Sequence, residues 1–218
     1  MQHQYVSLSH QAYEQIKRKI VSLELAPGAL INEGNLRDEL SLGRTPIREA
    51  LQRLAAERLV MIVPRRGMFV TEIGVSDLPR IFEIRLVLEP SATRLAALRG
   101  QPSHWIRMQE LLDNAPKGDS PKKNIAKIEI DQACHEIIYQ AAQNPLLVDT
   151  LSTLYSLSLR LWYFSLSQIG TMTEALDEHR IMLDVLRSGD GDKAAELMTA
   201  HIKTFQEEIQ TVMLGMPG

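Results

Sequence analysis

The chain contains the segment Gly43-Arg44-Thr45-Pro46-Ile47-Arg48-Glu49-Ala50-Leu51-Gln52-Arg53-Leu54. Thr45 is a residue type that caps helices, and a proline in the first helical position, here Pro46, has a preset φ angle and no amide proton to leave unpaired. Apolar side chains then recur with helical spacing and mark one face as core-facing: Ile47, Ala50, Leu51 and Leu54. The segment therefore predicts a helix that begins near residue 45 and packs against the protein core on one side.

The other face of this helix is polar and basic. It carries Thr45, Arg48 and Gln52, and Arg44 comes just before it. Arginine reads guanine edges or contacts phosphates, and glutamine can reach adenine, so this face suits a DNA major groove. An ordinary amphipathic surface helix is the alternative, and the neighbouring segments decide between the two.

Two more helices are predicted before this one. Residues 8–25 follow a helical pattern of apolar side chains, which stops before the turn at Pro27-Gly28. A short second helix follows with Asn32 as its N-cap, and Ser41-Leu42-Gly43 forms the turn into the third helix. This order of helices and turn is that of a helix-turn-helix DNA-binding domain.

A β-hairpin is predicted after the third helix. Residues 59–63 and 68–71 are β-prone runs on either side of Pro64-Arg65-Arg66-Gly67. Arg65 and Arg66 then lie at the tip of a wing that contacts the DNA backbone or the minor groove. Every part of a winged helix-turn-helix is present in order, which favours DNA binding over the surface-helix alternative.

Residues 8–72 resemble the amino-terminal domain of the GntR family of bacterial transcription regulators. Three motifs carry the resemblance: Pro27-Gly28, residues 44–51 and residues 64–70.

The resemblance implies which residues contact DNA. The expected groove and backbone contacts are Arg44, Thr45, Pro46 and Arg48. Gly67 is expected to let the wing backbone approach the DNA closely. Gly34 departs from the family pattern, because an arginine that contacts DNA is common at this position, and Ser41-Leu42-Gly43 replaces the usual Gly-Val-Ser.

Length and charge favour two domains with different roles. A chain of 218 residues can form two modest domains, for which we expect the boundaries 1–73 and 74–218. The net charge of −3 divides into +2 for the first part and −5 for the second. The acidic second part argues against another nucleic-acid surface there.

The location of the protein also follows from the sequence. The first residues are polar, which argues against a signal peptide, and the longest apolar stretch, residues 151–169, is interrupted by serines and by Arg160. We therefore expect the protein in the cytoplasm. The single cysteine, Cys134, excludes an intrachain disulfide and a cysteine-rich zinc site.

Helical periodicity dominates from Ser76 onward. Proline, glycine and asparagine interrupt it and divide this part into about six helices: 76–99, 103–114, 121–142, 145–168, 171–188 and 191–213. Short connections between such helices produce an antiparallel bundle. The predicted fold is therefore mainly α, with an N-terminal winged helix-turn-helix followed by an all-α helical bundle.

Polar side chains interrupt the apolar stripes of three bundle helices. The residues concerned are Asp131, His135, His179 and His201. A single histidine on such a face is usually a core histidine with a satisfied hydrogen bond, but three histidines and an aspartate on helices that pack together need a common partner. A divalent metal ion is such a partner for one carboxylate and three imidazoles.

Residues 76–213 resemble the helical FCD effector domain of the FadR subfamily, and the short connection after the wing resembles its six-helix, VanR-like group. In metal-containing members an aspartate and three histidines hold the ion, which implies that Asp131, His135, His179 and His201 are ligands. Zinc is expected first, with nickel or manganese as alternatives. We interpret Cys134, near the same face, as a small buried hydrophobe rather than a ligand.

Two arginines are candidates for binding an effector. Arg85 lies on a stripe with Ile81 and Leu88, and Arg160 lies among apolar residues. If either points inward, it can hold the carboxylate of a small ligand bidentately. For Arg85 the alternative is a surface pair with Glu89. The family resemblance also points to carboxylic-acid effectors.

The leading hypothesis is a ligand-responsive regulator of transcription that binds a palindromic operator in double-stranded DNA as a homodimer and a small organic acid in its bundle. The main alternative is a metallohydrolase with a DNA-binding appendage, although Tyr139 stands where a zincin motif needs its second histidine. A DNA-packaging protein is a third possibility, which the acidic larger domain disfavours.

Overall fold

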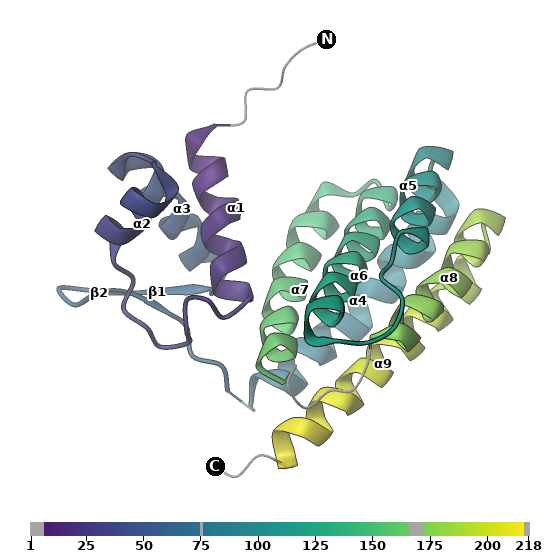
Figure 1. Ribbon diagram of the computed structural model, residues 1–218. Helices are drawn as coiled ribbons and strands as arrows, with labels where there is room; N and C mark the ends of the chain where they lie inside the picture. The colour runs from purple at the N-terminus through teal and green to yellow at the C-terminus, as the bar shows by residue number, and fades with distance from the viewer. Residues whose placement is uncertain (1–6, 75, 166–171, 216–218) are drawn as a thin grey trace. The chain divides into compact units, whose positions relative to one another are not determined.

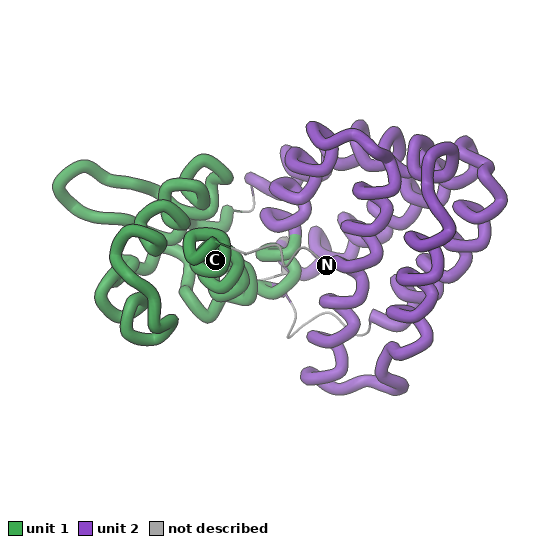
Figure 2. Tube along the Cα trace, turned by 90° about the horizontal axis from the view of Figure 1, so that it is seen from above, with its two compact units in different colours: residues 1–74, 159–164 green, residues 75–158, 165–218 purple. Residues whose placement is uncertain are grey.

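The structure is a computed structural model that describes residues 7–74, 76–165 and 172–215 (Figure 1). It divides into two compact units (Figure 2). The first contains residues 1–74 together with 159–164, and the second contains residues 75–158 and 165–218. The expected domain boundary between residues 73 and 74 stays a prediction.

The first unit contains three helices and one hairpin among its described residues: α1 (Leu8–Val21), α2 (Glu33–Leu40), α3 (Arg44–Ala56), β1 (Val60–Val63) and β2 (Gly67–Val70). The strands pair antiparallel, with Val60 opposite Val70 and Val63 opposite Gly67. An isolated bridge joins Leu30 to Phe69. The predicted winged helix-turn-helix is thereby confirmed.

The core of this unit lies between α1 and α3. Ile16 and Ile20 on α1 and Ile47, Leu51 and Leu54 on α3 are fully buried. The apolar stripe of residues 47–54 is therefore buried in the core, as the sequence predicted. Burial of a side chain of this size contributes about 1.5–3 kcal/mol.

Helix ends differ from the predictions by a few residues. Helix α1 ends at Val21 rather than Leu25, because Leu23 adopts a left-handed φ of 62°. Helix α3 begins at Arg44 with Gly43 as its N-cap, so the predicted N-cap Thr45 is wrong. Pro46 still lies in the first turn, where helix amides have no partner inside the helix. Asn32 does cap α2, accepting a hydrogen bond from the backbone N of Asn35.

The wing depends on a glycine. Gly67 begins β2 with φ 110°, a conformation that side chains strongly disfavour. A Cβ atom at this position would also lie 3.1 Å from Leu30 Cδ1. The hairpin turn therefore favours glycine at position 67 for local reasons, in addition to any approach of DNA.

Helices are the regular secondary structure found among the described residues of the second unit. Six helices follow one another: α4 (Asp77–Arg99), α5 (Pro102–Asp113), α6 (Pro121–Ala141), α7 (Pro145–Ser165), α8 (Thr173–Ser188) and α9 (Gly191–Gly215). Residues 159–164 of α7 group with the first unit. The predicted ends of the α7 and α8 segments at residues 166–168 and 171 lie outside the described residues.

The bundle core is built mainly on α4 and α9, which lie side by side (Figure 1). The rings of Phe82 and Phe205 contact each other across these helices, with 5.6 Å between their centroids. Helix α6 packs on α4 and α8, so one buried face receives side chains from several helices. No helix in the described ranges is long and apolar enough to cross a membrane.

Candidate functional site

The polar face of α3 is exposed. Thr45, Arg48 and Gln52 are open to solvent, as is Arg44 at the first helical position, while Pro46 is half-buried. The buried stripe on the opposite side holds the helix rigidly, so the exposed side chains have a fixed backbone beneath them. This arrangement suits insertion of a helix into a DNA groove.

A hollow of about 470 Å³ lies beside the start of α2. Its lining includes Gly34, Arg37 and Arg44. Gly34, where the resemblance leads us to expect an arginine, is therefore one wall of this hollow. Glu33 also lines it, and its Oε2 lies 3.9 Å from Nε of Arg48, a loose ion pair.

The tip of the wing presents two exposed cations. Arg65, Arg66 and Gly67 are all exposed, and the backbone N of Arg66 donates to Val63 O across the turn at 3.0 Å. Arg65 has a left-handed φ of 63°. The tip therefore offers two guanidinium groups on a tight turn, as a wing that contacts phosphates requires.

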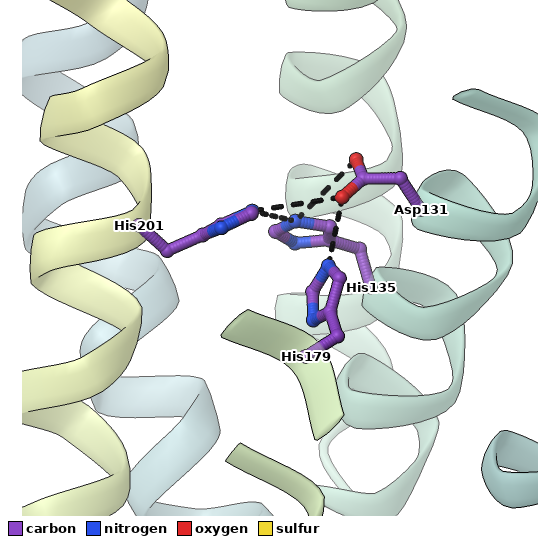
Figure 3. Close-up of side chains that lie close together, drawn as sticks. All are labelled: Asp131, His135, His179 and His201. Carbon is purple, nitrogen blue, oxygen red and sulfur yellow. Dashed lines mark hydrogen bonds and ion pairs between the residues drawn. The ribbon is translucent and has the colours of Figure 1, made fainter. Parts of the chain in front are cut away.

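The second candidate site is a cluster of four buried side chains in the bundle (Figure 3). Asp131 and His135 come from α6, His179 from α8 and His201 from α9. One potential ligand atom from each lies within 4.8 Å of the others. The spacing of four along α6 places Asp131 and His135 one turn apart on the same inward face.

The donor atoms converge closely enough for one metal ion. His135 Nε2 and His201 Nε2 are 3.2 Å apart, and Oδ1 of Asp131 lies 2.8 Å from Nε2 of His179 and 3.6 Å from Nε2 of His201. In a tetrahedral zinc site with bonds of about 2.0–2.1 Å, donor atoms lie about 3.3 Å apart. The three nitrogens and one oxygen therefore fit a divalent ion in both type and spacing.

Burial and mutual contact set the charges of the cluster. Burial raises the pKa of Asp131, but the hydrogen bond with His179 and the nearby histidines outweigh it and lower that pKa overall. Burial lowers the pKa of His179 to about 4. For His201 burial also lowers the pKa, but the hydrogen bond to Glu178 raises it overall. The aspartate is thus ionised and His179 neutral, which suits ligation of a cation, whereas the raised pKa of His201 means that an ion must displace its extra proton.

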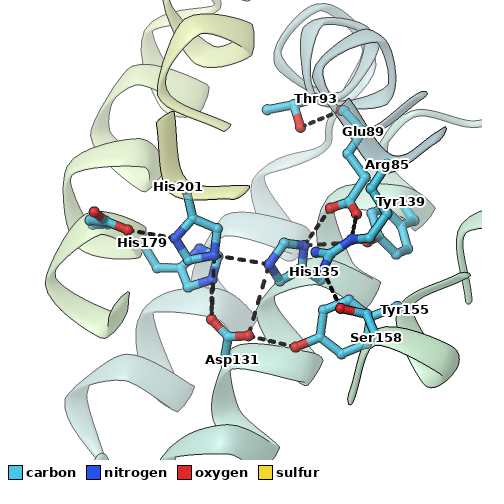
Figure 4. Close-up of polar contacts among 11 residues, drawn as sticks. Arg85, Glu89, Thr93, Asp131, His135, Tyr139, Tyr155, Ser158, His179 and His201 are labelled. Carbon is cyan, nitrogen blue, oxygen red and sulfur yellow. Dashed lines mark hydrogen bonds and ion pairs between the residues drawn. The ribbon is translucent and has the colours of Figure 1, made fainter. Parts of the chain in front are cut away.

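Several residues around the cluster were not predicted as part of the site (Figure 4). The hydroxyl of Tyr155 donates to Asp131 Oδ2 at 2.5 Å. Glu89 Oε2 lies 2.9 Å from His135 Nδ1, and Glu178 Oε2 lies 2.6 Å from His201 Nδ1. The sequence contained one signal for these residues: Glu89 lies one turn after Arg85, next to the apolar stripe of α4.

The two arginines predicted to bind an effector lie in different places. Arg85 is buried, pairs with Glu89 and donates to Ser158 Oγ at 2.5 Å, so its pair with Glu89 is an interior one rather than a surface one (Figure 4). Arg160 is also buried, but its guanidinium donates to Oγ1 and O of Thr71, at 2.7 and 2.5 Å. The structure thus brings Arg85 next to the cluster through Glu89 and gives Arg160 another partner.

Cys134 lies on α6 and is fully buried. Burial raises the pKa of its thiol, which keeps the sulfur protonated. This agrees with its interpretation as a small buried hydrophobe.

Comparison with known proteins gives two family matches that together cover most of the chain. The model for "Bacterial regulatory proteins, gntR family" matches residues 8–70, and the model for the FCD domain matches residues 80–204. The first match covers the winged helix-turn-helix, and the second lies within the helical bundle.

Full-length relatives are similar over nearly their whole length. The transcriptional repressor RspR of Escherichia coli is 26% identical over 205 residues, which are 94% of this chain and 90% of the relative. The Nta operon transcriptional regulator of Aminobacter aminovorans is 28% identical over 196 residues, covering 89% of this chain and 91% of that protein.

Solved structures show the same fold. McbR/YncC of E. coli superimposes with a TM-score of 0.83 at 24% identity, over 94% of this chain and 98% of the other. A putative GntR regulator from Rhodococcus gives a TM-score of 0.76 at 18% identity, over 94% and 99% of the two chains.

Proposed function

The chain belongs to the GntR family of DNA-binding transcription regulators, in the FadR subfamily with a C-terminal FCD domain, and on this basis we propose that a divalent metal ion and a small carboxylic acid control its binding to an operator. Its relatives are transcription regulators and not enzymes. The metallohydrolase alternative therefore loses its support.

The single observation that carries the proposal is the convergence of four buried donor atoms from three helices. Asp131, His135, His179 and His201 would hold the ion, and three imidazoles with one carboxylate suit zinc, with nickel and manganese as alternatives. A bound ion would supply positive charge and ligand positions for a carboxylate. This chemistry suits an organic-acid effector.

The effector proposal places its carboxylate at the ion. Arg85 acts in this scheme behind Glu89, because its guanidinium already pairs with that carboxylate and with Ser158. Arg160 was predicted as a second effector contact, but its hydrogen bonds to Thr71 give it a different role. The proposed effector site therefore takes no contact from Arg160.

The DNA-binding part of the proposal involves both α3 and the wing. Arg44, Thr45, Arg48 and Gln52 on α3 would enter the major groove, with Pro46 beside the backbone, and Arg65, Arg66 and Gly67 would contact the adjacent backbone or minor groove. A homodimer would place two such domains on a palindromic operator, with half-sites about 34–36 Å apart. Such a regulator would act in the cytoplasm, where bacterial DNA is.

A gel-shift titration under four conditions tests this proposal. The chain, with zinc or with EDTA, is titrated onto DNA from upstream of its own gene, in the presence or absence of a mixture of small organic acids. We expect selective binding that an acid changes only in the zinc-loaded protein, because the effector needs the ion. An acid response that is equal with zinc and with EDTA would remove the ion from the effector site.

A further inference from the structure

The three histidines of the cluster all direct the same ring nitrogen toward the common centre. Nε2 is the atom of His135, His179 and His201 that lies near the other donor atoms. A neutral imidazole carries one proton, so a ring that ligates through Nε2 must carry that proton on Nδ1. Whatever contacts Nδ1 therefore decides whether the ring is ready for a metal ion.

Two carboxylates contact these outer nitrogens. Glu89 on α4 lies 2.9 Å from Nδ1 of His135, and Glu178 on α8 lies 2.6 Å from Nδ1 of His201. They come from different helices than the histidines they contact, so the arrangement is tertiary and not a consequence of helical spacing. A carboxylate that is ionised accepts hydrogen bonds and donates none.

From these contacts we infer that Glu89 and Glu178 are positioning residues that keep the proton of His135 and His201 on Nδ1 and so present Nε2 to the ion. The inference rests on the metal site of the proposed function and names two residues outside its ligand set. A carboxylate behind a ligating histidine fixes the ring orientation and raises its basicity. Both effects strengthen metal binding.

The environment of Glu89 keeps it an acceptor. Its side chain is fully buried, and its other oxygen pairs with the Arg85 guanidinium, which favours the ionised carboxylate (Figure 4). Oε2 of Glu89 lies 2.9 Å from Nδ1 of His135, within ion-pair distance, although the alignment falls short of a hydrogen bond. Glu178 makes the equivalent contact from a partly exposed position.

One other group competes for His135. The hydroxyl of Tyr139 lies 3.3 Å from Nδ1 and can donate to it, which would move the ring proton to Nε2 and block ligation. The nearer, charged Glu89 favours the opposite arrangement. His179 differs from both rings, because its Nδ1 is buried without a hydrogen-bond partner in the described part of the chain.

Zinc titration of purified protein tests the inference. Competition with a chromophoric chelator measures the zinc affinity of the wild type, Glu89→Gln and Glu178→Gln. The matched controls are Glu83→Gln on α4 and Glu174→Gln on α8, both of which are exposed carboxylates on the same helices. We expect about 10- to 100-fold weaker zinc binding in each of the two positioning variants. The controls should stay at the wild-type affinity.

Nitrogen NMR of histidine-labelled protein reports which ring nitrogen carries the proton. Loss of folding would not produce the same change. We expect protons on Nδ1 of His135 and His201, with and without zinc, and a mixed or Nε2-protonated ring for His201 in Glu178→Gln. Glu178→Gln is needed beside Glu89→Gln because the latter leaves Arg85 buried opposite a neutral amide and can destabilise the bundle.

The outcomes separate this inference from the proposed function. Wild-type protein that binds none of zinc, nickel and manganese would refute the metal site, while the protonation of Nδ1 would still be decided by the spectrum of the metal-free protein. Zinc binding with wild-type affinity in both folded glutamine variants would overturn the positioning role and leave the metal site intact. A proton on Nε2 of His135 in the wild type would mean that Tyr139, rather than Glu89, determines the position of the ring proton.

Discussion

The hydroxyl of Tyr155 donates a hydrogen bond of 2.5 Å to Oδ2 of Asp131, which joins α7 to the buried cluster. The other oxygen of the same carboxylate faces His179 at 2.8 Å. Each oxygen of this buried anion thus has its own partner, and this division leaves Oδ1 directed at the histidines.

Tyr155→Phe should destabilise the protein by about 1–3 kcal/mol, because it leaves a buried carboxylate oxygen without this donor. Urea unfolding of the EDTA-treated variant measures the loss. A double-mutant cycle with Asp131→Ala is the control, since the tyrosine hydroxyl should matter much less when the carboxylate is absent. Strictly additive losses would show that the hydrogen bond does not contribute.

Arg48→Ala should abolish selective operator binding and leave the bundle folded. The side chain is exposed on the outer face of α3, and loss of one good base contact costs about 1–3 kcal/mol per subunit. Gel-shift titration on operator and on unrelated DNA measures both affinity and selectivity. The matched control is Arg187→Ala, which removes an exposed arginine from α8. Unchanged selectivity in Arg48→Ala would mean that α3 does not enter the groove.

The protein should be a dimer in solution. A single winged domain contacts too little DNA for tight and selective binding, whereas two half-sites about one helical turn apart supply the missing contacts. Light scattering should give twice the chain mass of 24.6 kDa for the free protein, and the mass of that dimer plus one duplex on operator DNA. A strict monomer in both states is incompatible with a palindromic operator.

Helical periodicity predicted those parts of the structure that depend on one helix at a time. It placed Leu51 and Leu54 in the core and Asp131 and His135 together on one inward face, because a spacing of three or four residues fixes which side chains share a face. It could not fix helix ends. Gly43 caps α3 although glycine has no side chain to accept a hydrogen bond, so the prediction of the more typical N-cap Thr45 is wrong.

Helical periodicity could not predict contacts between residues that are far apart in the sequence. Glu178 is adjacent in sequence to His179 but contacts His201, and Arg160 reaches Thr71, 89 residues earlier in the chain. A buried charged side chain needs a partner, but the sequence does not say which one. Tertiary packing makes that choice.

Removal of the metal ion should lower both stability and effector response. The ion would tie α6, α8 and α9 together, and it would bind the folded chain far better than the unfolded one. At a free metal concentration 100 times the dissociation constant, this linkage contributes about 2.7 kcal/mol, or about 5–10 °C in Tm for a protein of this size. Melting curves and effector titrations on native and EDTA-treated protein, with metal content measured in each, test both effects.

His179→Ala should act like chelation in both measurements, because it removes one of the four donors and leaves at most a weakened three-ligand site. His10→Ala, which removes an exposed histidine from α1, is the matched control and should retain the metal, the Tm and the effector response. If the histidines were only core packing, EDTA would change neither the Tm nor the response, and zinc, nickel or manganese would add no stability to metal-free protein. A native preparation that behaves in this way and still answers its effector would reduce Asp131 and the three histidines to buried polar packing.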